Sequence, residues 1–255
     1  MSRTPPVLRT GVILAGGRSS RIGEPKALLE LAGEPLLRHV ARALAPSCDE
    51  LIVVAAPADA QPAALQLALA REVRGLARRW QLLHGTERPA RLRPRVRLVH
   101  DVDAHLGPVS GLASALAVAR GARAFVAACD IPFLAPALVA GLFSRGEAEP
   151  SCDVVVPRWN GYLEPLLTVY RVSSMAAHYA RQLADGELRP MARLAALRVD
   201  VVDEADVVKL DPAGRSFVNV NAREDYAAAR ALVEDAAIAP GSRPGRSRRG
   251  FPAGA

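Results

Sequence analysis

A cationic, glycine-rich loop near the start of the chain carries residue types that bind phosphate. Gly16 and Gly17 follow an apolar run at residues 12–14, and Arg21 and Lys26 come within the next ten positions. Glycine lets a backbone approach a ligand closely, and backbone amides with fixed cations beyond the end of a strand suit a phosphate chain. The loop therefore predicts a phosphate site, although a plain turn between a strand and a helix can have the same glycines.

The spacing within this loop differs from two common nucleotide-binding patterns. Five residues rather than four separate Gly17 from Gly23, and Lys26 does not follow Gly23 directly, so the Walker A pattern is absent. The dinucleotide fingerprint Gly-x-Gly-x-x-Gly is absent as well. Lys26 still stands out, because the chain has 31 arginines and only one other lysine, Lys209. An ammonium on a flexible stem suits a phosphate that moves during a reaction.

Two aspartates follow apolar segments that are predicted to be buried strands. Asp101 comes directly after residues 95–100, and Asp130 comes directly after residues 124–129. Parallel strands end at one edge of a sheet, so we expect both carboxylates at the edge that carries the glycine-rich loop. Mg²⁺ would remove their repulsion of phosphate, because it takes one or two carboxylates together with substrate phosphates. Either aspartate alone is more typical of a helix N-cap or a turn, but the pair favours a metal-assisted phosphate site.

Other kinds of chemical site are less favoured. His100, Asp101, Asp103 and His105 lie close in sequence, but no further ligands recur at the spacing of a transition-metal site. The three cysteines are widely spaced and form no Cys-x-x-Cys pair, which argues against a zinc site and a disulfide framework. No serine lies in a nucleophile-elbow pattern.

The order of the predicted elements indicates an α/β domain with a mostly parallel sheet. Strands and helices alternate through the first part of the chain. Residues 166–170 follow the strand at 154–156 without an intervening helix, so we expect an antiparallel member. Residues 101–111 are expected to form a polar loop. The predicted strands are residues 12–14, 51–55, 95–100, 124–129, 154–156, 166–170 and 199–202, and the predicted helices are residues 36–45, 61–83, 112–120, 135–143, 175–183, 191–197 and 223–234.

Composition and charge limit the class of protein. The 255 residues are 50% apolar and 4% aromatic, which disfavours a stacking platform for nucleic acid. The net charge of +7 is regional, because residues 71–97 hold nine arginines against two glutamates and residues 241–255 hold four more arginines. We predict a single domain over residues 1–238, with an arginine-rich insertion within about 58–95, and a disordered basic tail at 239–255. No apolar run is long enough for a membrane span and no signal-peptide core opens the sequence, so we expect a cytoplasmic protein.

Four segments resemble the molybdenum cofactor guanylyltransferases, a family within the nucleotidyltransferase superfamily. They occur in the order of that family, and the resemblance spans residues 11 to about 235. The first segment alone marks the wider superfamily, whereas the paired asparagines of the last are more discriminating. The segments are Leu14-Ala-Gly-Gly-Arg-Ser-Ser-Arg-Ile-Gly-Glu-Pro-Lys26, Gly107-Pro-Val-Ser-Gly111, Cys129-Asp-Ile-Pro-Phe-Leu134 and Phe217-Val-Asn-Val-Asn-Ala-Arg-Glu-Asp225.

The resemblance implies a three-layer α/β/α, Rossmann-like nucleotidyltransferase fold. It also implies an enzyme that binds GTP and Mg²⁺, transfers GMP to the terminal phosphate of molybdopterin and releases pyrophosphate. Such a transfer needs positioning and charge neutralisation rather than a covalent nucleophile. Docking to cofactor-biosynthesis or acceptor proteins is a further expectation, whereas no nucleic-acid or membrane partner is expected.

The resemblance further assigns residues of the first segment to the nucleotide. The backbone of Leu14, Ala15, Gly16 and Gly17 would hold the nucleotide. Arg21 would help to neutralise its triphosphate.

A second group of residues would carry the reaction. Lys26 would contact the phosphates, Asp101 would lie in the nucleotide site, and Asp130 would bind Mg²⁺, and these three are the predicted catalytic residues. Asn219 and Asn221 would line the acceptor side.

Two features depart from the family pattern. The family commonly has an asparagine at the end of its second strand that helps to read the base, whereas residues 53–57 contain none. The arginine-rich segment 71–97 is longer than expected. We interpret it as a solvated insertion; the alternative is a docking surface for an acidic partner or the anionic pterin. Two alternatives therefore remain: a cytidylyltransferase acting on the same pterin or another small-molecule phosphate, and a non-catalytic nucleotide-binding adaptor.

Overall fold

The computed structural model describes residues 8–16, 26–84, 95–103 and 106–238. The predicted basic tail, most of the glycine-rich loop and part of the arginine-rich segment lie outside these ranges. The division into one domain and a tail therefore stays a prediction.

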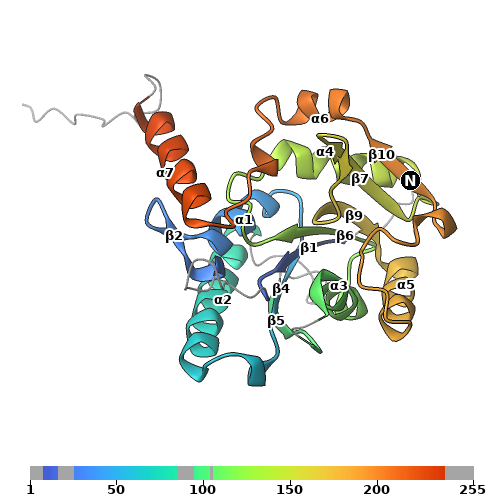
Figure 1. Cartoon of the computed structure of the whole chain (residues 1–255), viewed down its shortest axis with the longest axis horizontal. Coiled ribbons are helices and arrows are strands. Elements are labelled where there is room, and N and C mark those ends of the chain that lie inside the picture. Colours follow the sequence, from blue (N-terminus) through green and yellow to red (C-terminus); the bar gives the residue numbers. More distant parts are fainter. Residues whose placement is uncertain (1–7, 17–25, 85–94, 104–105, 239–255) are drawn as a thin grey trace, which may run out of the picture.

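A mixed sheet forms the middle layer of the molecule (Figure 1). Its strand order is β10-β7-β9-β6-β1-β4-β5, with β8 paired to β7. The strands β1, β4, β5 and β6 run parallel, and β9 runs antiparallel to both β6 and β7, so the predicted mostly parallel sheet with an antiparallel member is confirmed. The strands are β1 Arg9–Leu14, β4 Glu50–Ala55, β5 Arg95–His100, β6 Arg123–Ala128, β7 Val154–Trp159, β8 Tyr162–Leu163, β9 Leu167–Arg171 and β10 Val199–Val202.

Helices cover both faces of this sheet, which gives the three-layer α/β/α arrangement (Figure 1). The two faces alternate along each strand, so that in β1 Ile13 packs toward one helical layer and Val12 toward the other. One layer contains α1 Leu36–Leu44, α2 Ala63–His84, α4 Pro136–Ala148 and α6 Glu204–Leu210, and the other contains α3 Gly107–Val118 and α5 Val172–Ala184.

The last helix lies apart from these layers. α7 Arg223–Ile238 packs against a small hairpin of β2 Glu30–Leu31 and β3 Glu34–Pro35 (Figure 1). The hydroxyl of Tyr226 donates a hydrogen bond of 2.5 Å to the backbone oxygen of Glu30. This contact joins the C-terminal segment to the segment that follows the glycine-rich loop.

Two predicted elements were wrong. The expected loop at 101–111 is shorter, because α3 already begins at Gly107 with Pro108 in its first turn. Proline is tolerated there, since its missing N–H has no partner within a helix. The expected helix at 191–197 is reduced to the 3-10 turn Leu194–Ala196, none of whose residues is buried, so no packing stabilises so short a helix.

The sequence did not predict a small hairpin, a short helix and a short strand. The β2–β3 hairpin turns at Ala32 and Gly33, which both have positive φ, at 53° and 75°. Such a turn usually carries asparagine or aspartate before the glycine, and alanine gives no such signal. The short helix α6 and the two-residue strand β8 were also not predicted. Within the described residues, no helix has the length and apolar character that a membrane span requires.

The packing between α4 and the sheet generates a stability prediction. Phe143 is fully buried, with its ring centroid 6.3 Å from that of Phe125 and the guanidinium of Arg9 5.0 Å above the ring. Phe143→Ala should lower the free energy of unfolding by about 3–5 kcal/mol, measured by urea denaturation. Leu82→Ala is the control, because Leu82 is 84% exposed and its loss should change stability by less than about 0.5 kcal/mol. Equal midpoints for the two variants would contradict this packing.

Candidate nucleotide-binding site

The topology of the sheet predicts a ligand crevice between the carboxyl ends of β1 and β6, which are neighbouring parallel strands. After β1 the chain passes through α1 to β4 on one side, and after β6 it passes through α4 to β7 on the other. Connections that diverge from neighbouring parallel strands leave room for a ligand between the strand ends.

The described part of the glycine-rich loop leaves β1 in close contact with β4. The N–H of Ala15 donates a hydrogen bond of 2.7 Å to the backbone oxygen of Val54. A Cβ atom at Gly16 would lie 2.8 Å from the backbone nitrogen of Ala56, a separation that side chains do not tolerate. Only glycine therefore fits this approach without a shift of the backbone. Gly17 and Arg21 lie outside the described residues.

Lys26 contacts two segments that lie far from it in the sequence. Its Nζ donates a hydrogen bond of 2.9 Å to Oδ2 of Asp130 and one of 2.5 Å to Oδ1 of Asn221. The side chains of Lys26 and Asp130 are 20% and 16% exposed, so solvent only partly screens the ion pair. The structure thus brings together two predicted catalytic residues and one of the predicted acceptor-side asparagines.

Backbone hydrogen bonds hold the asparagine segment beside Asp130. The N–H of Val220 donates to the backbone oxygen of Asp130 at 2.8 Å. Oδ2 of Asp225, in the first turn of α7, accepts the N–H groups of Asn221 and Ala222, each at 2.8 Å. A carboxylate at this position satisfies free amides at the helix start and is favoured by the helix dipole. Asn219 is exposed two residues earlier.

Asp101 is fixed by donors from α3. It is 8% exposed, and its Oδ1 accepts hydrogen bonds from the hydroxyl of Ser110, from the hydroxyl of Ser114 at 3.3 Å and from the N–H of Val102 at 2.7 Å. A Cβ atom at Gly111 would lie 3.2 Å from Leu14 and 3.7 Å from Oδ2 of Asp101, so the glycine keeps this side of the carboxylate open.

The two predicted aspartates, Asp101 and Asp130, lie at the ends of strands that are not neighbours in the sheet. Both follow their strands at the carboxyl edge, but β1 and β4 lie between β6, which precedes Asp130, and β5, which precedes Asp101. Asp130 is therefore the carboxylate at the lysine, and Asp101 lies at the end of β5, with β1 and β4 between them.

The thiol beside Asp130 offers no nucleophile to this site. Burial, and secondarily the charge of Asp130, raises the pKa of the Cys129 thiol to about 12, so the thiol is protonated and non-nucleophilic at neutral pH. Among the described residues, no three histidine, cysteine, aspartate or glutamate side chains are grouped as metal ligands. The hard oxygen donors that do converge are those of Asp130 and Asn221, with the Lys26 ammonium between them.

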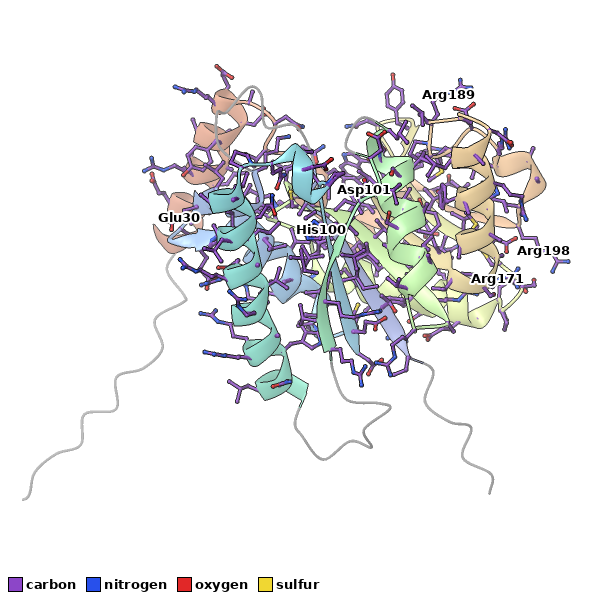
Figure 2. All side chains as sticks on the ribbon, turned by 90° about the horizontal axis from the view of Figure 1, so that it is seen from below. Glu30, His100, Asp101, Arg171, Arg189 and Arg198 are labelled. Carbon is purple, nitrogen blue, oxygen red and sulfur yellow. The ribbon has the colours of Figure 1, made fainter. Side chains whose placement is uncertain are left out.

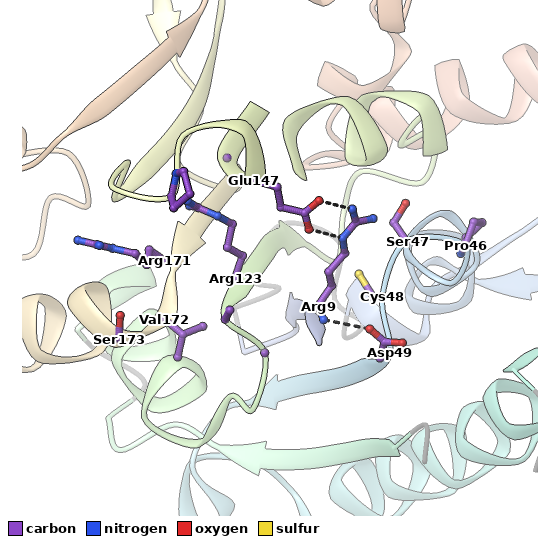
Figure 3. A pocket seen from close by; sticks show the side chains of 14 residues that line it. Arg9, Pro46, Ser47, Cys48, Asp49, Arg123, Glu147, Arg171, Val172 and Ser173 are labelled. Carbon is purple, nitrogen blue, oxygen red and sulfur yellow. Dashed lines mark hydrogen bonds and ion pairs between the residues drawn. The ribbon is translucent and has the colours of Figure 1, made fainter. Parts of the chain in front are cut away.

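A cavity of about 840 Å³ opens at the opposite edge of the sheet, at the start of β1 and β6 (Figure 3). Its arginines are already engaged by protein groups. Arg9 forms two hydrogen bonds with Glu147 at 2.6 and 2.7 Å, Arg171 pairs with Asp153, and Arg123 donates to two backbone carbonyl oxygens. Of the predicted site residues that the structure describes, none lines this cavity.

Sequence reasoning missed the residues that orient the site. Ser110 and Asp225 lie within segments that marked the resemblance, but no role was predicted for either. Ser114 gave no signal, because its function depends on α3 starting at Gly107 and turning this face of the helix toward Asp101.

Comparisons with known proteins identify the family of the chain. The model of the MobA-like NTP transferase domain matches residues 11–201. A probable molybdenum cofactor guanylyltransferase of Pelotomaculum thermopropionicum is 33% identical over 226 residues, which cover 89% of this chain and 94% of the relative. A protein of the same name from Natronomonas pharaonis is 34% identical and covers 87% and 96% of the two chains.

A solved structure supports the fold. The crystal structure of molybdopterin-guanine dinucleotide biosynthesis protein A from Archaeoglobus fulgidus has a TM-score of 0.68 to this chain at 24% identity. The match covers 89% of this chain and 99% of that one. The predicted nucleotidyltransferase fold is confirmed.

The close approach of Gly16 to β4 can be tested by stability. Gly16→Ala should lower the free energy of unfolding by about 1–3 kcal/mol, because the added methyl group meets backbone rather than a movable side chain. Gly75→Ala is the matched control, since Gly75 lies within α2 with nothing within 4 Å of its added Cβ. That change should raise stability by about 0.5–1 kcal/mol through helix propensity. Thermal and urea unfolding of both variants measure the difference, and the same sign of change in both would refute the proposed contact.

Proposed function

Because the chain belongs to the MobA-like NTP transferases and its relatives include molybdenum cofactor guanylyltransferases, we propose that it transfers GMP from GTP to the terminal phosphate of molybdopterin. The enzyme is a nucleotidyltransferase of molybdenum cofactor biosynthesis. The observation that carries the finer proposal is the contact of Lys26 with Asp130 and Asn221 in the crevice between β1 and β6.

In the proposed reaction, a phosphate oxygen of molybdopterin attacks the α-phosphorus of GTP. A new P–O bond forms, the bond from the α-phosphorus to the bridging oxygen of the β-phosphate breaks, and pyrophosphate leaves with those electrons. The proposal needs no covalent enzyme intermediate, in keeping with a buried, protonated Cys129 as the nearest thiol to Asp130 in sequence. The chain contributes position and charge.

Lys26 is proposed to bind the phosphates of the nucleotide. Its ammonium is a compact point charge on a flexible stem and lies between Asp130 and Asn221. A triphosphate carries more negative charge than the single Asp130 carboxylate, so arriving phosphates can draw the lysine toward themselves. Gly16, at the end of β1, would then let the loop backbone approach the same phosphates.

The oxygen atoms that contact Lys26 are also suitable ligands for Mg²⁺. The carboxylate of Asp130 and the amide oxygen of Asn221 are hard oxygen ligands, and an ammonium already lies between them. Asp130, with Asn221 beside it, would hold the ion, which supplies charge neutralisation for the phosphates and for the leaving pyrophosphate. A site with so few protein ligands suits an ion that keeps waters and substrate phosphates.

Asp101 is proposed to contact the nucleoside of GTP, and Asn219 is proposed to contact the molybdopterin. Oδ1 of Asp101 is occupied by its three donors, which leaves Oδ2 to accept a hydrogen bond from a nucleoside hydroxyl. Asn219 is exposed on the other side of the crevice, beside Asn221, where the pterin phosphate would approach.

The function is tested by pyrophosphate release with each of the four nucleoside triphosphates, with molybdopterin as acceptor. We expect release with GTP, dependence on molybdopterin, and loss of release when EDTA removes Mg²⁺. Faster release with CTP would establish a cytidylyltransferase, for which the lack of a hydrogen-bonding side chain at Ala55, Ala56 and Pro57 leaves room. GTP binding without pyrophosphate release would instead support a nucleotide-binding adaptor.

The role of Asp130 gives a second test. Asp130→Ala should reduce Mg²⁺-dependent transfer by at least about 10²–10³-fold without unfolding the protein, because it removes a charge that orders both cations. Asp203→Ala is the control, since this carboxylate is 71% exposed at the start of α6. Near-normal turnover of Asp130→Ala would refute the site assignment.

A further inference from the structure

The end of β4 leaves base recognition without an obvious side chain. Ala55, Ala56 and Pro57 carry no hydrogen-bonding group, and the backbone of Ala56 is in contact with Gly16. A site that distinguishes one nucleobase from another needs fixed donors or acceptors at the base edge. Another element must therefore supply them.

The position of the phosphates limits where the base can lie. In the proposed function Lys26 and Asp130 hold the phosphates at the ends of β1 and β6, and the asparagine segment lies on the side next to Asp130. The nucleoside then extends the other way, over the ends of β4 and β5. The three strand spacings from β6 to β5 make about 14 Å, which is on the scale of an extended nucleotide. The base would thus arrive at the end of β5.

His100 is the last residue of β5 and is exposed at this edge. Figure 2 shows it beside Asp101, between α2 and α3. Its ring nitrogen Nδ1 lies 3.0 Å from the backbone oxygen of Ala56. Because a carbonyl oxygen only accepts, Nδ1 carries the hydrogen and donates it, and the neutral ring presents a lone pair at Nε2. The turn after β4 thereby fixes both the orientation and the tautomer of the imidazole.

We propose that His100 is the base-reading residue, with Nε2 accepting a hydrogen bond from the N1–H and N2-amino edge of guanine. This inference rests on the proposed function. Adenine has a lone pair at N1, which would face the Nε2 lone pair and be repelled. A pyrimidine is shorter, so its edge falls short of an acceptor fixed on β5. A neutral acceptor anchored through Ala56 thus takes the place of the asparagine that is absent from the end of β4.

The other polar side chain at this strand end is less suited to the base. Asp101 directs Oδ1 toward Ser110, Ser114 and Val102, and its carboxylate lies on the α3 side of the sheet near Gly111. His100 lies two residues after Leu98 and therefore on the same face of β5. Leu98 packs with the α1 and α2 layer, so this face is opposite to the α3 side. The two residues are thus separated in role, with Asp101 toward the nucleoside hydroxyls and His100 toward the base.

The test compares GTP, ITP and ATP within one protein, so that the ratio of affinities does not depend on the active fraction. His100→Phe keeps a ring but removes the acceptor, and His100→Gln offers an amide oxygen in its place. We expect the preference for GTP over ATP to fall roughly tenfold in His100→Phe and to be partly restored in His100→Gln, by direct binding titration and by kcat/KM. His178→Phe on α5, in the opposite helical layer, should leave the preference unchanged.

The outcomes separate this inference from the proposed function. If wild-type protein prefers GTP and His100→Phe keeps the same preference over ATP, His100 does not read the base and the transfer reaction stands. If wild-type protein releases no pyrophosphate from any nucleotide, the proposed function fails first. ITP locates the hydrogen bond, because it retains N1–H and lacks the 2-amino group; a wild-type preference for ITP equal to that for ATP would overturn an N1–H contact.

Discussion

A single ammonium group connects the parts of the molecule that make up its site. Lys26 donates to Asp130, 104 residues later, and to Asn221, 195 residues later. Each partner comes from a different structural unit: the end of β6 and the segment that leads into α7. Without that cation, the Asp130 carboxylate would stand partly buried and unpaired at the edge of the sheet. The crevice between β1 and β6 therefore depends on charge complementarity as much as on the sheet.

The surrounding backbone explains why this contact is specific. Val220 donates to the backbone oxygen of Asp130, and Asp225 accepts the backbone N–H groups at the start of α7. The backbone of Asn221 is therefore held in position independently of its side-chain contact with Lys26. On the N-terminal side, Tyr226 of α7 holds the backbone of Glu30. The Tyr226 contact thus joins the asparagine segment to the lysine segment, and the Val220 contact joins it to Asp130, which limits the side-chain entropy that the contact must overcome.

The sequence contained most of the fold but only part of the site. Buried strands such as β4 and β6 are continuous apolar runs, and their parallel order follows from the helices between them. The strand ends at Asp101 and Asp130 were predictable for the same reason. The direct contact of Lys26 with Asn221 was not, because it depends on how the last segment returns to the sheet. The turn at Ala32 and Gly33 was missed since its backbone conformation lacks the usual residues, and Pro108 concealed the start of α3.

The two functions of such a site place different demands on the chain. Phosphates are recognised by charge, and a lysine, a carboxylate and a close backbone approach are sufficient whatever base the nucleotide carries. The base is recognised by neutral donors and acceptors whose value depends on an exact direction. Asparagine on β4 and histidine on β5 can therefore serve the same purpose, provided that something fixes the side chain. In this protein the carbonyl of Ala56 does so for His100, and the strand that lacks the side chain still determines its tautomer.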